Sequence, residues 1–133
     1  MRKIYPKLQI THTNYKNIMF DFENLDVYRK AKELNKDVLN FLRQNKQIDS
    51  YIKDQLKRAS ISVVINIAEG SGKFSKADKR NFYTISRGSV YECASLLELI
   101  FDENQISKEK SVDFYQKFEI LSKMLLGLIN SQK

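Results

Sequence analysis

Apolar residues recur at the three- and four-residue spacing of an α-helix in four long segments of the chain, with polar residues between them. The first segment predicts a helix over residues 25–44, with Asn24 as its N-cap. The second predicts a helix that begins behind Asp49 or Ser50 and ends at Gly70, a residue suited to the C′ position. The centre of this segment is rich in β-branched residues and, taken alone, is typical of a strand. Its flanks favour helix, so we expect one helix throughout.

The third and fourth segments predict two further helices with clear starting signals. A capping box begins at Ser75, with Phe74 in the position of a hydrophobic staple, and the helix behind it reaches about Phe101. The last helix follows Ser107 and reaches about Asn130. The positions of these two helices that we expect to face inward are Phe82, Ile85, Ser89, Cys93, Leu96 and Ile100 in the third, and Val112, Tyr115, Phe118, Leu121, Leu125 and Leu128 in the fourth.

Four helices joined by short connections are typical of an all-α, antiparallel up-down-up-down four-helix bundle. No proline follows Pro6, which fits long uninterrupted helices, and 133 residues are enough for one domain. We expect the bundle to occupy residues 22–133. Residues 1–21 lack helical periodicity and are expected to form an extended or mobile arm. Met19 directly precedes the first patterned segment, so a biological start at Met19 is an open alternative.

The second helix is apolar on two sides. One stripe is expected to face the core of its own bundle and consists of Ile52, Leu56, Ala59, Val63 and Ile67. A helix in a small soluble bundle needs only one such stripe, so we expect the second stripe to meet another subunit. The predicted subunit-interface residues are Ile61, Val64, Ile65 and Ala68.

A stripe of polar residues runs between these two apolar stripes, and a comparable one follows the third helix. We favour a partly buried hydrogen-bonded network that fixes helix register and subunit orientation. An arginine-lined surface that contacts phosphates and simple solvated faces are the alternatives. The residues concerned are Gln55, Arg58, Ser62, Asn66 and Glu69 in the second helix, and Arg80, Thr84, Arg87, Tyr91 and Glu98 in the third.

The net charge of +7 is concentrated in two parts of the chain. Residues 1–18 carry four bases and no acid, and residues 53–87 carry eight bases against three acids. Residues 88–133, in contrast, carry five bases against seven acids. Positive fields of this kind attract nucleic-acid phosphates, although exposed lysines are also ordinary solvated surface. The candidate nucleic-acid-binding residues are Arg58, Lys73, Lys76, Lys79, Arg80 and Arg87, and Tyr83 is a candidate for base stacking or, alternatively, for packing.

The chain offers little for catalysis or for metal binding. Its only histidine, His12, lies in the expected arm, and its only cysteine, Cys93, lies on a face that we expect to be buried. Neither a zinc site nor an activated thiol is therefore predicted. The segment around Gly70, Gly72 and Lys73 lacks the first glycine and the hydroxyl residue of a phosphate-binding loop. We expect no catalytic residue, no metal and no cofactor, and a protein that is not an enzyme.

Three features of the sequence bear on its compartment. A single cysteine cannot form an internal disulfide, which fits a reducing environment. No apolar run approaches the roughly 20 residues that span a membrane, and no signal-peptide pattern is present. We expect a cytoplasmic protein without a membrane partner.

Four stretches of the sequence carry a resemblance to a known family. They are residues 22–28 (Phe-Glu-Asn-Leu-Asp-Val-Tyr) leading to Ala31, residues 55–62, residues 66–70 (Asn-Ile-Ala-Glu-Gly), and Gly88-Ser89 followed by Glu92. Together they resemble the four-helix-bundle family of 23S rRNA intervening-sequence proteins, which also includes the accessory proteins of diversity-generating retroelements. The resemblance covers residues 22–129.

The resemblance implies subunits that pack through their long sides into a ring-like homo-oligomer, a homopentamer. It also implies association with rRNA or another structured RNA, which backbone phosphates would mediate. The alternative is a protein-binding scaffold or accessory subunit, for example to a reverse transcriptase, with no nucleic-acid binding of its own. This chain departs from the family at Tyr28, where tryptophan is frequent, and at Lys73, where arginine is frequent. Lysine keeps the charge but loses bidentate phosphate geometry.

Overall fold

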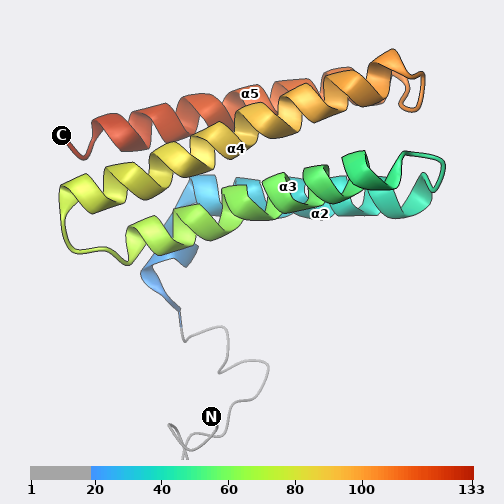
Figure 1. Cartoon of the computed structure of the whole chain (residues 1–133). Coiled ribbons are helices and arrows are strands. Elements are labelled where there is room, and N and C mark those ends of the chain that lie inside the picture. The colour runs from blue at the N-terminus through green and yellow to red at the C-terminus, as the bar shows by residue number, and fades with distance from the viewer. Residues whose placement is uncertain (1–18) are drawn as a thin grey trace, which may run out of the picture.

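Four long helices make up most of the computed structural model, which describes residues 19–133 (Figure 1). A short 3-10 helix, η2 (Asp21–Asn24), precedes them, and none of the described residues lies in a strand. The all-helical prediction is therefore confirmed, including the β-branched segment in the second helix. Most of the arm predicted for residues 1–21 falls on residues 1–18, which lie outside the described part. The long helices are α2 (Asp26–Gln44), α3 (Ser50–Ser71), α4 (Lys76–Asp102) and α5 (Lys108–Asn130).

Side-chain caps start three of the helices, as the sequence predicts. The carboxylate of Asp49 accepts hydrogen bonds from the first backbone N–H groups of α3. Ser75 and Ser107 each accept one from the third residue of α4 and α5, respectively. These bonds satisfy donors that a helix start leaves without partners inside the helix. Phe74 is not a hydrophobic staple, because its side chain is fully exposed instead of packing on the helix behind it.

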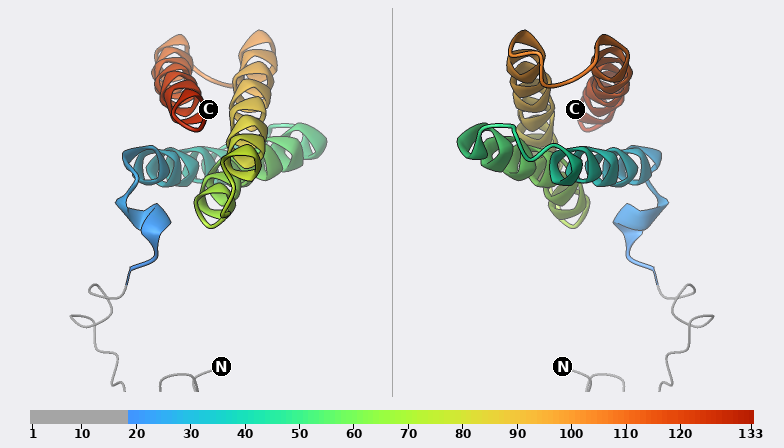
Figure 2. Two further views of the ribbon diagram at one scale, coloured as in Figure 1. Left: turned by 90° about the vertical axis from the view of Figure 1, so that its left-hand side faces the viewer. Right: turned by 90° about the vertical axis from the view of Figure 1, so that its right-hand side faces the viewer.

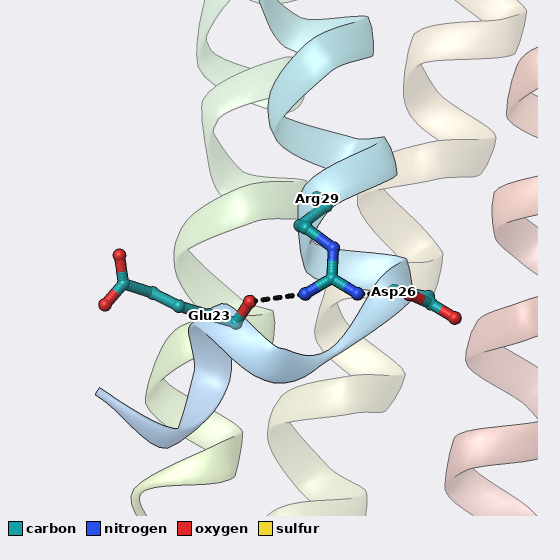
Figure 3. A network of polar contacts seen from close by, with 3 residues as sticks. All are labelled: Glu23, Asp26 and Arg29. Carbon is teal, nitrogen blue, oxygen red and sulfur yellow. Dashed lines mark hydrogen bonds and ion pairs between the residues drawn. The ribbon is translucent and has the colours of Figure 1, made fainter. Parts of the chain in front are cut away.

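The start of α2 differs from the prediction, because Asn24 ends η2 and Leu25 occupies the N-cap position without a side-chain bond. An arginine ties the two helices together instead. Nη1 of Arg29 donates to the carbonyl oxygen of Glu23 at 2.7 Å, and Nη2 donates to the carboxylate of Asp26 (Figure 3). These bonds link η2 to the start of α2, where no N-cap side chain is bound.

The end of α3 also differs, because the helix continues through Gly70 to Ser71 and Gly72 is its C-cap. The glycine at position 70 meets a packing need and does not end the helix. A Cβ atom built there would lie 2.6 Å from Cε1 of Tyr83, closer than real Cβ contacts. Gly70 therefore lets α3 and α4 approach each other just before the turn that joins them.

The helices form two layers. Figure 2 shows α4 and α5 on one side of the bundle and α2 and α3 on the other. Along α3 and α4 the paired residues run in opposite order, since Lys79 bonds Ser71 and Ser86 bonds Val63. The largest side chains that are fully buried between the layers come from all four helices and include Leu42, Leu56, Ile67, Ile100, Phe114, Leu121 and Leu125.

The inward faces of α4 and α5 are partly rotated from those predicted. Ile85, Val112 and Tyr115 are exposed, whereas Tyr83 and Phe114 are buried. Besides Tyr83, the buried positions of α4 are four residues without a hydroxyl group and two serines, namely Val90, Cys93, Leu97, Ile100, Ser86 and Ser89. Buried polar groups are tolerated when they are hydrogen-bonded, and the hydroxyl of Ser86 donates to the carbonyl oxygen of Val63 at 2.7 Å. Small serines on this face keep α4 close to α3.

The helices were also compared with the length and hydropathy that a membrane span needs, and none of those described meets both requirements.

Candidate nucleic-acid interface

The six cations predicted to contact phosphates do not form one cluster. Lys73, Lys76 and Lys79 lie on the turn between α3 and α4 and on the first turn of α4. At 1.5 Å per residue, Arg58 lies about 20 Å back along α3 from the end of that helix. Arg87 lies about 16 Å along α4 from its first residue. The structure therefore brings together the lysines and leaves Arg58 apart.

Two of the lysines hold the turn in place. Nζ of Lys79 donates to the carbonyl oxygen of Ser71 at 2.8 Å, which caps the last turn of α3 from the start of α4. Nζ of Lys73 lies 4.8 Å from the centre of the Phe82 ring, a cation–π contact. Both ammonium groups keep further N–H donors, since each has three and uses at most one for a hydrogen bond in the described structure. The turn is thus ordered and still strongly basic.

The two arginines of α4 bind backbone carbonyl oxygens near the C-terminal end of the described chain, one in α5 and one just after it. Nη1 of Arg80 donates to the carbonyl oxygen of Gln132. Nε of Arg87 donates to the carbonyl oxygen of Ser122 at 3.1 Å, and its guanidinium group lies over the ring of Tyr91. Both arginines have an intramolecular role that the sequence did not reveal. Their contact with phosphates stays a prediction, and the lysines are the better candidates.

The field around the turn is positive for two reasons. Residues 70–80 carry four bases and a single acid, Asp78. The N-terminal end of α4, which lies here, adds the positive end of a helix dipole. None of the ion pairs within the described residues involves Lys73, Lys76 or Lys79. The lysine cluster of the described structure therefore keeps its positive charge free of direct carboxylate partners.

The predicted polar stripe of α3 divides into a bonded part and an exposed part. Ser62 and Ser89 share a hydrogen bond of 2.7 Å between α3 and α4, and Nδ2 of Asn66 donates to the hydroxyl of Ser62 at 3.0 Å. On the other side of α3, the hydroxyl of Ser60 donates to Asn35 of α2 at 2.8 Å. The Ser62–Ser89 and Ser60–Asn35 bonds join α3 to α4 and to α2, and the Asn66–Ser62 bond lies within α3. No hydrogen bond within the described residues involves the side chains of Gln55, Arg58 or Glu69.

The second apolar stripe of α3 is narrower than predicted. Val64 is buried in the core of its own chain, so its assignment to a subunit interface is wrong. Val64 packs toward the core because α3 has helices on two sides and buries more than one stripe within the chain. Ile61 and Ile65 are 44% and 47% exposed, and Ala68 is half-buried. These three residues remain the surface stripe.

Two candidates for chemistry are buried. Burial raises the pKa of the Cys93 thiol, and the charge of Glu92 raises it further, so the thiol stays protonated and packs as a small core residue. Tyr83 is 2% exposed and burial raises its pKa, so its candidacy for base stacking is wrong. The described residues contain no group of three His, Cys, Asp or Glu side chains that could hold a metal ion. His12 lies outside the described part.

A groove of about 170 Å³ separates α2 from α5, floored by Leu34 and Leu121. Nζ of Lys117 on its rim lies 3.1 Å from Asp113 and 3.8 Å from Asp37. The hydrogen bond to Asp113 raises the pKa of Lys117, and the neighbouring carboxylates add to the effect. Of the charged groups that line this groove, Lys117 and Asp37 are paired, whereas Lys30 and Glu33 form no ion pair within the described residues.

The geometry defines an all-helical bundle protein with a basic turn at one end. The chain belongs to the family of 23S rRNA-intervening sequence proteins, whose family model matches residues 23–127. It is also similar to the crystal structure of a protein of unknown function from the S23 ribosomal protein family of Bacteroides thetaiotaomicron. That similarity has a TM-score of 0.74 at 24% identity and covers 78% of this chain and 95% of the other. No curated protein matches the chain.

Sequence reasoning missed one residue at this end of the bundle. Phe74 stands in the turn between α3 and α4, directly after Lys73, and its relative exposure of 104% is the highest among the large apolar side chains of the described residues. The signal was present in the sequence, because an apolar aromatic residue interrupts the polar run from Ser71 to Lys76. The hydrophobic-staple pattern offered a packing role for Phe74, which its exposure contradicts.

Proposed function

We propose that this protein is a non-catalytic, basic homo-oligomer that binds structured RNA through backbone phosphates at the turn between α3 and α4. One observation carries the proposal: Lys73, Lys76 and Lys79 lie together on an ordered turn, and no carboxylate of the described residues forms an ion pair with them. Lysines in this state bind phosphates as point charges, which gives affinity with little sequence preference. Membership of the 23S rRNA-intervening sequence family supports RNA as the partner.

The direct test reverses the charge of the cluster. The triple variant Lys73→Glu, Lys76→Glu, Lys79→Glu should lose retention of a structured rRNA fragment in a fluorescence anisotropy assay, because repulsion replaces each phosphate contact. The matched control reverses three exposed lysines of α2 and of the turn behind it, Lys32, Lys36 and Lys46, and changes the net charge equally. Circular dichroism checks that both triple variants are folded. Equal binding by the two variants would contradict the assignment of the cluster.

The proposal includes an assembly, in which bundles of antiparallel up-down-up-down topology pack into a ring, a homopentamer. The exposed stripe of Ile61, Ile65 and Ala68 supports it, because a soluble monomer gains nothing from two isoleucines in water. The opposite order of the paired residues along α3 and α4 supports the topology.

Ile61→Asp tests the assembly more cleanly than a change at Val64, which would place a charge in the core of the chain itself. We expect monomers by sedimentation velocity, since a charge in the seam would have no partner. Tyr51→Asp, a change to the same acid at a still more exposed position at the start of α3, serves as the control and should assemble normally. A fully assembled Ile61→Asp protein would show that the stripe is not the seam.

A second candidate is a protein-binding scaffold or accessory subunit, for example to a reverse transcriptase, without nucleic-acid binding of its own. A shallow hollow between α4 and α5 favours it, because the exposed aromatic side chains of Phe101 and Tyr115 line this hollow. The genomic neighbourhood separates the candidates. A gene inside an rRNA gene favours RNA, and a gene beside a reverse transcriptase favours the scaffold.

A further inference from the structure

We propose that Phe74 stacks on an unpaired base, so that the RNA bound at the α3–α4 turn is one with a loop or a single-stranded segment. This inference rests on the proposed function and adds the class of RNA to it. The lysines alone would bind any phosphate backbone, paired or not. An exposed aromatic ring among them adds a contact that only an unstacked base satisfies.

The position of Phe74 in the structure is what separates it from the other aromatic residues of this region. Its side chain is fully exposed at a relative exposure of 104%. Phe82 lies under the ammonium group of Lys73, and Tyr83 is buried beside Gly70. Of the three rings, only that of Phe74 is fully exposed, since Phe82 is half-buried and Tyr83 is buried.

The surroundings of Phe74 fit a nucleic acid. Lys73 precedes it directly, Lys76 follows two residues later, and Lys79 bonds the carbonyl of Ser71 across the same turn. Single-stranded nucleic acids are bound by combining a basic surface for the backbone with aromatic rings for the bases. Phenylalanine has no hydrogen-bonding group, so it offers a stacking surface without reading base identity. We therefore expect a preference for unpaired over paired RNA and little preference among bases.

A tryptophan introduced at this position would report stacking directly, since the chain contains no tryptophan. Emission of Phe74→Trp should be quenched by an RNA hairpin with an unpaired loop and not by a blunt duplex of the same stem. The matched control is Tyr51→Trp, another exposed aromatic position, about 30 Å away along α3. Its emission should change with neither RNA. Equal quenching of Phe74→Trp by hairpin and duplex would overturn the inference.

Affinity provides the second readout. Phe74→Ala should weaken binding of the looped hairpin by about five- to 150-fold, which corresponds to loss of one stacked base. Binding of the duplex and the salt dependence should not change, because no charge is removed. Tyr51→Ala should bind both RNAs as the wild type does.

The outcomes separate this inference from the proposed function. A wild-type protein that binds neither RNA would overturn both. A wild-type protein that binds both RNAs, together with Phe74→Ala binding the hairpin equally well, would overturn the role of Phe74 alone. An altered oligomeric state of Phe74→Ala would assign the side chain to a subunit contact and would also overturn it.

Discussion

Two turns of this bundle have the same structural role but differ in charge and in the exposure of their apolar residue. The turn from α3 to α4 and the turn from α4 to α5 each connect helices that pack side by side, and each ends in a serine N-cap, Ser75 or Ser107. The second turn buries its apolar residue, Ile106, at 8% exposure, whereas the first leaves Phe74 entirely in solvent. Residues 70–80 carry four bases and one acid, and residues 102–109 carry three acids and one base.

The comparison shows which features of a turn the fold requires. Both turns need a cap and a tight reversal, so the serines and the close approach at Gly70 are accounted for by structure. The α4–α5 turn closes without an exposed phenylalanine or a lysine cluster. In the first turn Lys73 and Lys79 also make structural contacts, but the exposed Phe74 and the density of positive charge go beyond what closing a turn requires. These surplus features of the first turn are therefore where function is to be sought.

The largest expected difference between the turns is in stability. Ile106→Ala should lower the free energy of unfolding by about 2–3 kcal/mol, because it leaves a cavity at the edge of the core. Phe74→Ala should change it by less than about 0.5 kcal/mol, as exposed positions do. Chemical denaturation at one protein concentration measures both. A loss of stability in Phe74→Ala equal to that in Ile106→Ala would remove the contrast between the turns.

Substitutions of Gly70 test whether the close approach of α3 and α4 is needed for stability. Gly70→Ala should destabilise the protein by about 1–3 kcal/mol, because its Cβ atom would clash with the Tyr83 ring. Gly72 in the same turn is the matched control, since a Cβ atom there meets only ordinary contacts at 3.6 Å and beyond. Gly72→Ala should be neutral or slightly stabilising in the same denaturation experiment. Equal effects of the two substitutions would mean that the close approach is not needed.

The serine caps should be equivalent. Ser75→Ala and Ser107→Ala each remove one bond to a helix N-terminus and should each cost about 1 kcal/mol. The matching Ser→Asp variants should restore most of the stability, because aspartate also caps a helix. A loss of stability in only one of the two Ser→Ala variants would show that the N-cap bond stabilises one turn and not the other.

The smallest expected effect concerns Asn104, which has a φ of 59° in the second turn. Asn104→Gly should stabilise the protein by up to about 1 kcal/mol, since glycine adopts this left-handed conformation without steric cost. Thermal unfolding of the two proteins side by side measures the shift. Destabilisation of this variant would indicate that the asparagine side chain contributes a contact of its own.

The approximate extents of the helices and three of the four N-caps were predictable from the sequence, because both depend on residues that are close together in the chain. The caps at Asp49, Ser75 and Ser107 need only the residues that follow them. The start of α2 was not predictable in this way, because Arg29 reaches back to Glu23 from inside the helix. The role of Gly70 depended on Tyr83, thirteen residues away, and no local pattern contains that contact.

The faces of the helices were harder to predict for a tertiary reason. Each helix packs on two neighbours, so its buried side is wider than one stripe and its centre depends on where those neighbours lie. Ser86 is polar and yet fully buried, because its hydroxyl donates a hydrogen bond to the carbonyl oxygen of Val63. The lysine cluster of the candidate site followed from the sequence. The bonds of Arg80 to Gln132 and of Arg87 to Ser122, and the exposure of Phe74, did not follow from it.

The central claim is that the lysines of the first turn bind RNA phosphates, and the salt dependence of binding tests it most directly. We would measure the affinity of a structured rRNA fragment across a salt series for the wild type and for Lys73→Gln, Lys76→Gln, Lys79→Gln. The account predicts a linear fall of log affinity with log salt, and a slope smaller by about 2–3 in the variant, since each phosphate contact contributes about 0.7–0.9. Identical slopes for the two proteins, or no binding by the wild type at low salt, would contradict it.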